Sequence, residues 1–99
     1  MAQVAPTRRA TDTDYLLDYL TEHWRGLAEV ARQWPDWGAT DQEVFALEWT
    51  VKDERLAQLQ ERASQGELTA AQRTRYETLL KLVARNRPLL ERLLTTSAP

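Results

Sequence analysis

Cysteine is absent from this chain of 99 residues, and glycine, proline and histidine occur only three times, four times and once. The lack of cysteine excludes a disulfide framework and any thiolate metal site, so packing alone has to hold the fold together. A single histidine, His23, leaves no pair of imidazoles for a metal ion, and we expect neither a metal nor another cofactor. Three glycines do not form the phosphate-binding loops of nucleotide-binding folds.

Long apolar runs are missing as well. No stretch approaches the roughly 18 consecutive apolar residues that are needed to span a bilayer. Arg8 and Arg9 are not followed by an apolar stretch, so the first ten residues do not predict a secretory signal. We therefore expect a cytoplasmic protein with no membrane-spanning part.

The residues that dominate the chain favour helices. Ala, Leu, Glu, Gln and Arg prevail from Tyr15 to Leu94, and β-branched or aromatic residues nowhere form an alternating run. The length fits one domain, because typical domains hold about 100–150 residues. We predict a single all-α domain over residues 12–94, with a flexible tail at 1–11 and a frayed C-terminus at 95–99.

The first helix is predicted to run from residues 12–14 to Trp34. Its start is marked by Asp12, Thr13 and Asp14, which can cap free N–H groups, and its end by Pro35. Apolar residues recur between these points at steps of three and four: Leu16, Leu20, Trp24, Leu27, Ala31 and Trp34. This face is typical of an amphipathic helix that packs on a core.

Capping signals delimit two further helices. Thr40 precedes Glu43 by three residues, and Thr69 precedes Gln72 by the same spacing, which is that of the capping box. Gly66 stands where a glycine ends a helix. The short loop predicts that the second and third helices form a long αα-hairpin, and that the three helices form an antiparallel bundle.

Two features of these helices carry specific expectations. Val44, Leu47 and Val51 widen the apolar arc of the second helix, so we expect its first half to be sandwiched between other elements. Pro88 interrupts the third helix, at a cost of about 3 kcal/mol in a helix interior. The apolar positions keep their phase across the proline, which favours a kinked continuation, or two coaxial segments hinged near Asn86, over a loop. We therefore predict a last helix that is kinked or broken near Pro88.

The sequence contains no clear set of catalytic residues. Glu48 is the best-placed acid, and we expect it to pair with Lys52 four residues later on an exposed strip. A general acid–base pair of Glu48 with Asp53 or Glu22 has no specified geometry. We predict that the protein is not an enzyme and has no small-molecule substrate.

Surplus apolar residues indicate a protein partner. Leu89, Leu90, Leu93 and Leu94 offer more apolar surface than one facing helix covers, and Trp37 lies in a loop where it can act as an anchor. We therefore predict a non-catalytic protein–protein interaction module that uses these five residues. Such a module would be a small adaptor, an accessory subunit, an inhibitor of a larger partner, or a homo-oligomer.

The distribution of charge leaves an alternative open. The net charge is −2, but the acids concentrate in residues 12–65 and the bases in residues 66–99. The basic segment either lies against the acidic one, within the chain or across a homodimer, or it meets phosphates. In the second case the protein is a small nucleic-acid-associated regulator whose binding residues are Arg73, Arg75, Arg85 and Arg87.

Overall fold

The part of the chain that the structure describes is entirely helical. This computed structural model describes the backbone of residues 4–96 and the side chains of residues 12–95, with no strand among them. Its elements are α1 (Val4–Arg25), α2 (Leu27–Gln33), the short 3-10 helix η1 (Trp34–Asp36), α3 (Ala39–Ser64) and α4 (Ala70–Thr96). The predicted all-α class is confirmed.

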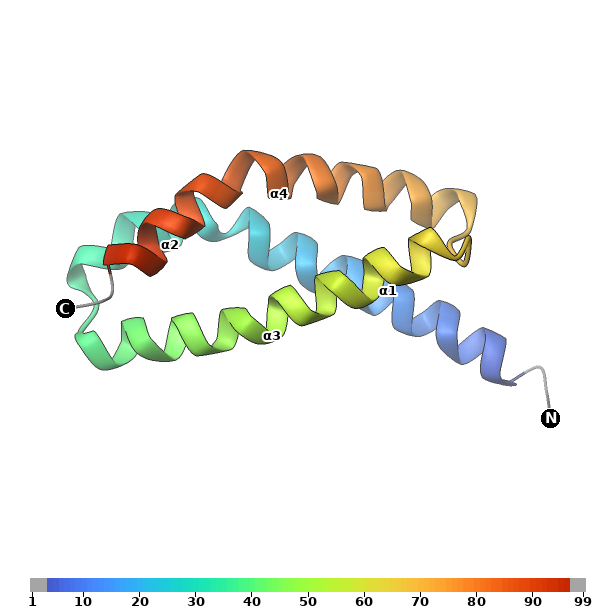
Figure 1. Cartoon of the computed structure of the whole chain (residues 1–99), viewed down its shortest axis with the longest axis horizontal. Helices are drawn as coiled ribbons and strands as arrows, with labels where there is room; N and C mark the ends of the chain where they lie inside the picture. The colour runs from blue at the N-terminus through green and yellow to red at the C-terminus, as the bar shows by residue number, and fades with distance from the viewer. Residues whose placement is uncertain (1–3, 97–99) are drawn as a thin grey trace.

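The helices form an elongated molecule with principal extents of 51 × 26 × 18 Å. α1 packs against both α3 and α4, and α2 packs against α4. Figure 1 shows the N-terminal part of α1 reaching beyond the other helices at one end, whereas α2 and the first turns of α3 meet at the opposite end. The side chains between the helices therefore lie along the long axis of the molecule.

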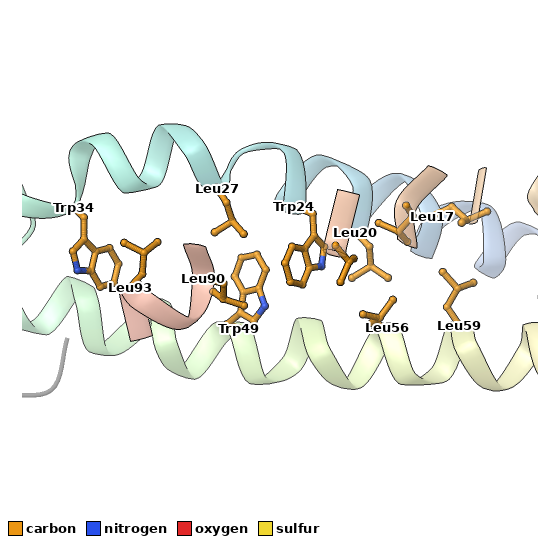
Figure 2. Close-up of a cluster of buried hydrophobic side chains, with 12 residues drawn as sticks. Leu17, Leu20, Trp24, Leu27, Trp34, Trp49, Leu56, Leu59, Leu90 and Leu93 are labelled. Atoms are coloured by element: carbon orange, nitrogen blue, oxygen red, sulfur yellow. The ribbon is translucent and has the colours of Figure 1, made fainter. Parts of the chain in front are cut away.

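Leucine and tryptophan side chains fill this space (Figure 2). Trp24 from α1 and Trp49 from α3 are both buried, and their rings meet edge to face with centroids 5.1 Å apart. The same core contains Leu17, Leu20, Leu27, Trp34, Leu56, Leu59, Leu79, Val83, Leu90 and Leu93. Full burial of one such side chain stabilises a fold by about 1.5–3 kcal/mol, so this row of contacts holds the helices together.

The first helix begins earlier than the sequence predicts. α1 starts at Val4, and residues 4–11, expected to form a flexible tail, are helical. Pro6 is compatible with this start because the first N–H groups of a helix have no intrahelical partner, so proline loses nothing there. At the other end α4 stays helical through Thr96. Residues 1–3 and 97–99, which belong to the predicted tail and frayed end, lie outside the described residues.

The predicted kink or break near Pro88 is wrong. α4 is one continuous helix that contains Pro88. Pro88 and Ala84 are both exposed, so the Ala84 carbonyl that loses its helical donor can face water. Leu90 and Leu93 are buried and hold the next turn against the core.

The interruption lies at Gly26, between α1 and α2. The Gly26 N–H donates to Glu22 O at 3.1 Å, and the Val30 N–H donates to Gly26 O at 3.2 Å. Helical hydrogen bonding therefore continues across the bend, although glycine is the weakest helix former after proline. The helix predicted to end at Trp34 is thus two segments, followed by η1.

Local signals define the loop between α3 and α4. Gly66 has a φ of 72°, and the N–H groups of Gly66 and Glu67 donate back to Ala63 O and Arg62 O, which is a Schellman motif. The Thr69 N–H donates to Gln72 Oε1 at 2.9 Å and the Gln72 N–H to Thr69 Oγ1 at 3.1 Å. The capping box predicted at the start of α4 is confirmed.

The capping box predicted for Thr40 and Glu43 is wrong. α3 begins at Ala39 with Gly38 as its N-cap, and no side chain caps it. The amide of Gln42 instead donates to Trp34 O at 3.1 Å, which ties the start of α3 to η1. This tertiary contact fixes the start of the helix and leaves Thr40 inside its first turn.

Candidate functional site

The leucines predicted to bind a partner lie in or beside the core. Leu90 is 1% exposed and Leu93 is 6% exposed. Leu89 and Leu94 are partly buried and pack against the core cluster. Leu90 and Leu93 are not accessible to a second protein in this fold, because α1 and α2 pack against α4.

Trp37 is half-buried at the end of the molecule where η1 leads into α3. Its ring centroid lies 5.4 Å from that of Trp34 and 5.9 Å from that of Phe45. Beside it is a shallow hollow that is lined by Trp37, Asp41, Val44, Phe45 and Glu48. Trp37 is therefore both a plug over the core and part of an accessible surface.

An exposed apolar row follows the first half of α3. Val44 is 45% exposed, Leu47 71% and Val51 43%. Their steps of three and four residues place them on one side of the helix, and we call them the α3 stripe. The expectation that this half of α3 is sandwiched is wrong, since the other helices cover only its opposite side.

The charged residues that α3 exposes are all acidic. Every residue of α3 is described, and no lysine or arginine is among its exposed residues. The exposed residues do include five acids: Asp41, Glu43, Glu48, Glu54 and Glu61. The exposed surface of α3 therefore combines the apolar stripe with acids and has no exposed base.

The three basic residues of α3 are buried or partly buried, and each contacts side chains of α1 or α3. Lys52 is only 7% exposed, and its ammonium lies 5.3 Å from the Trp49 ring centroid and 5.9 Å from that of Tyr19. The Arg55 guanidinium lies 4.9 Å from the centroid of the Tyr19 ring. Arg62 Nη1 donates to Thr13 Oγ1 at 2.9 Å.

Burial lowers the pKa of the Lys52 ammonium, and the charge of Arg55 adds to that shift, whereas Glu48 opposes it. No ion pair between Glu48 and Lys52 occurs among the described residues. The predicted exposed pair is therefore wrong, because Lys52 points to the aromatic rings of the core and Glu48 to water.

His23 lies at the edge of this aromatic group. Its ring centroid is 4.5 Å from that of Tyr19. Burial lowers the pKa of the imidazole, the charge of Lys52 lowers it further, and Glu22 and Glu48 oppose the shift. Among the side chains that the structure describes, no three acids or histidines come together as a metal-binding group.

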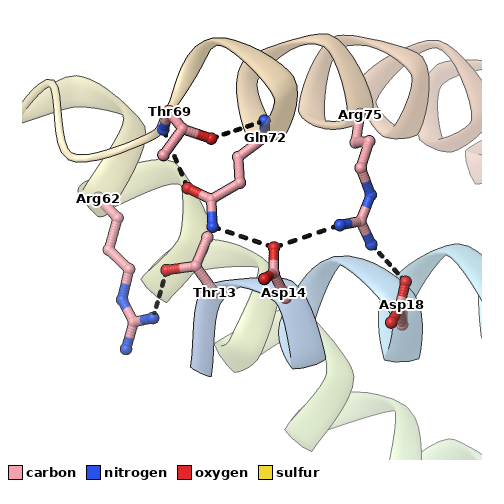
Figure 3. A network of polar contacts seen from close by, with 7 residues as sticks. All are labelled: Thr13, Asp14, Asp18, Arg62, Thr69, Gln72 and Arg75. Atoms are coloured by element: carbon pink, nitrogen blue, oxygen red, sulfur yellow. Dashed lines mark hydrogen bonds and ion pairs between the residues drawn. The ribbon is translucent and has the colours of Figure 1, made fainter. Parts of the chain in front are cut away.

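Two of the four arginines predicted to bind nucleic acid are engaged within the chain. Arg75 pairs with Asp14 at 3.3 Å and with Asp18 (Figure 3). Arg87 pairs with Asp53 at 3.3 Å, and its guanidinium lies 4.9 Å from the Trp24 ring centroid. Arg73 and Arg85 are exposed on α4.

Polar contacts tie the loop end of the molecule together (Figure 3). Asp14 Oδ1 accepts from Gln72 Nε2 at 3.0 Å and from Arg75 Nη1 at 3.3 Å. Gln72, which forms the capping box of α4 with Thr69, thereby also binds Asp14 of α1. This network stabilises the contact between α1 and α4 and leaves the α3 stripe untouched.

Glu48 and Asp53, two of the three acids considered for catalysis, lie in different surroundings, and the charges of Glu22 and Glu48 both act on His23. Glu48 is exposed on α3, whereas Asp53 pairs with Arg87 of α4. Within residues 4–96, no helix is both long and apolar enough to cross a bilayer. No protein-family model matches the chain, and neither a curated protein nor a solved structure is significantly similar to it.

Proposed function

We propose that this protein is a non-catalytic protein–protein interaction module and that the α3 stripe is its binding surface. The observation that carries the proposal is the exposure of Leu47, 71%, in a row with Val44 and Val51. Trp37, beside the hollow at one end of the row, keeps its predicted role as an anchor. The buried Leu90 and Leu93 lose theirs.

Apolar burial supplies the driving force for such an association. Removing a leucine or valine side chain from water contributes about 1.5–3 kcal/mol when burial is complete. Amphipathic helices bind other proteins through apolar residues at steps of three, four and seven. Val44, Leu47 and Val51 present the matching spacing.

The proposed scaffold is an antiparallel three-helix bundle in which α3 and α4 form the hairpin and α1 with α2 forms the third arm. Contacts of α1 with both α3 and α4 support this arrangement. In such a bundle the core side of α3 is held rigidly, and its outer side is available to another protein. The partner then meets a preformed surface.

Affinity capture with matched variants tests the proposal. The tagged wild type, Leu47→Gln and Ala57→Gln are each used to capture proteins from the cells that make the protein. Ala57 is the control because it is also exposed on α3 but lies outside the stripe. We expect a partner that the wild type and Ala57→Gln retain and that Leu47→Gln loses.

The same variants also show whether Leu47→Gln loses the partner only because it is less stable. Because Leu47 is exposed, Leu47→Gln should change the free energy of unfolding by less than about 0.5 kcal/mol, as measured by urea denaturation. A partner that Leu47→Gln retains as well as the wild type does would contradict the proposal, as would the absence of any partner.

Nucleic-acid binding is the weaker proposal. Arg73 and Arg85 are exposed, but Arg75 and Arg87 already have carboxylate partners. A phosphate-led mode predicts binding that weakens steeply as salt rises. Titration of Arg73→Ala/Arg85→Ala and wild type with duplex DNA and with single-stranded RNA tests it, and equal binding by both proteins would exclude these residues.

A further inference from the structure

We infer that the partner of the α3 stripe presents a cationic amphipathic helix, with apolar residues three and four apart and lysine or arginine beside them. This inference rests on the proposed function and adds the chemistry of the partner. It draws on the charges that border the stripe, on the hollow at its end, and on the size of the apolar row.

Acids border the stripe on both sides. Glu43 stands four residues before Leu47, and Glu54 three residues after Val51, so both lie along one border. On the other border, Asp41 precedes Val44 by three residues and Glu48 follows it by four. A helix that covers the stripe must therefore place its own flanking residues next to these carboxylates.

Three of the four border acids have no basic partner among the described residues. The Lys52 ammonium and the Arg55 guanidinium lie over aromatic rings, and Lys52 also interacts with the charge of Glu48. Asp41, Glu43 and Glu54 form no ion pair with another side chain in the described part of the molecule. Cations of a partner would meet charges that are still available, and interactions of this kind select partners and speed their encounter.

The hollow at the end of the stripe suits a long basic side chain. Two of its walls, Trp37 and Phe45, are aromatic, and two further residues, Asp41 and Glu48, are carboxylates. Lysine and arginine bury an aliphatic stem on apolar walls and keep a charged end near acids or ring faces. The hollow therefore combines the two kinds of contact that these side chains make.

A second copy of this chain fits the surface poorly. A two-fold dimer places the same patch on both subunits, so α3 would lie on α3 and the bordering acids would face one another. Like charges brought together in an interface are unfavourable. Phosphate backbones and anionic lipids are disfavoured for the same reason.

The dimensions of the stripe fit a short helix. Seven residues separate Val44 from Val51, which at the helical rise corresponds to about 10 Å. Two to three turns of a partner helix cover that length. A single amphipathic helix is thus sufficient as the occupant.

Two synthetic peptides test the inference against the full chain. Both have about 18 residues, long enough to form an isolated helix, with leucines at steps of three and four. One carries lysine beside the leucines and its twin carries glutamate. Binding is measured by NMR chemical-shift titration, which also locates the contact. We expect the lysine peptide to shift Val44, Leu47 and Val51, and the glutamate twin to bind at least about ten-fold more weakly.

Charge-reversed variants provide the matched control. Glu43→Lys/Glu54→Lys removes one acidic border, whereas Glu77→Lys/Glu91→Lys makes the same change of net charge on the exposed surface of α4. We expect the first variant to lose the preference for the lysine peptide and the second to keep it. Equal preference in both variants would overturn the inference, because the total charge of the protein would then explain the binding.

Other outcomes separate this inference from the proposed function. If both peptides bind equally and Leu47→Gln abolishes both, the surface binds proteins but the cationic partner is wrong. If neither peptide binds, or if sedimentation shows a dimer that Leu47→Gln dissociates, the cationic helix is likewise overturned. Failure of the proposed function is recognised separately, by capture of a partner that does not depend on Leu47.

Discussion

Lys52 illustrates how one side chain changes the charge of a helix surface. Its side chain is mostly buried, and its ammonium lies near the rings of Trp49 and Tyr19. Glu48, its neighbour one turn earlier, is left exposed. The spacing alone predicts an ion pair between them. The Trp49 ring lies one turn away on the same helix, whereas the position of Tyr19, on α1, is determined only by the fold.

His23 makes the stability of the protein depend on pH. Burial and the nearby charge of Lys52 lower the pKa of the folded imidazole below its usual value of about 6.5. Between the two pKa values the unfolded chain binds more protons, so the free energy of unfolding increases with pH. We expect this contribution to be complete above the usual pKa, to decline as the pH falls, and to be lost below the folded pKa.

Urea denaturation at several pH values between about 5 and 8 measures the effect. His23→Gln is the comparison, since the carboxylates contribute equally to both proteins. We expect the wild type to lose more stability than His23→Gln as the pH decreases. A wild type that gains stability relative to the variant on acidification would show that Glu22 and Glu48 outweigh burial.

At the scale of the helices, two glycines with different backbone conformations should respond oppositely to alanine. Gly66 has a φ of 72°, a region that costs other residues about 1–2 kcal/mol, so Gly66→Ala should destabilise the protein by about 1 kcal/mol. Gly26 has a φ of −77°, and a Cβ there would meet Glu22 O at 3.5 Å, an ordinary contact. Gly26→Ala should therefore stabilise the protein by about 0.5–1 kcal/mol.

Thermal and urea unfolding of both variants check that the two changes in the free energy of unfolding have opposite signs. Each variant is the other's control, because the same side chain is added in both. A destabilised Gly26→Ala would mean that the bend between α1 and α2 needs glycine for a reason other than backbone freedom.

Ends of helices that depend on neighbouring residues could be predicted from the sequence, and interruptions that depend on packing could not. Gly66 and the Thr69–Gln72 box act through contacts within a few residues, and both occur as predicted. Pro88 is a stronger helix breaker than Gly26, yet α4 continues through it. The buried leucines that follow Pro88 hold that turn in place. Their phase in the sequence indicates that the apolar face continues past the proline, but not whether the helix bends there.

The exposure of the α3 stripe could not be predicted from the sequence for a related reason. Its valines and leucine are apolar, and apolar residues around a wide arc predict a helix covered on several sides. Which side is covered depends on where α1 and α4 lie. The candidate site could therefore be predicted only as surplus apolar surface, and the sequence placed it on the leucines of α4, which the core uses.

At the scale of the whole molecule, opposite charges hold the helices together at two points. Near the loop end, Arg75 of α4 binds Asp14 and Asp18 of α1. Farther along, Arg87 of α4 binds Asp53 of α3. The basic α4 thus uses part of its charge on acids of the same chain, and the acids of the α3 stripe are not among them.

Arg87 connects α4 with two other helices, because it lies over Trp24 of α1 while it pairs with Asp53 of α3. Arg87→Ala should lower the free energy of unfolding by about 1–2 kcal/mol, from a cation–π contact worth about 0.5–1 kcal/mol and a partly exposed ion pair worth at most about 1 kcal/mol. Arg85→Ala is the matched control, since Arg85 is exposed on the same helix. Urea denaturation should give Arg85→Ala the same free energy of unfolding as the wild type. Equal losses in both variants would mean that the net charge of α4, and not the contact with Trp24 and Asp53, stabilises the molecule.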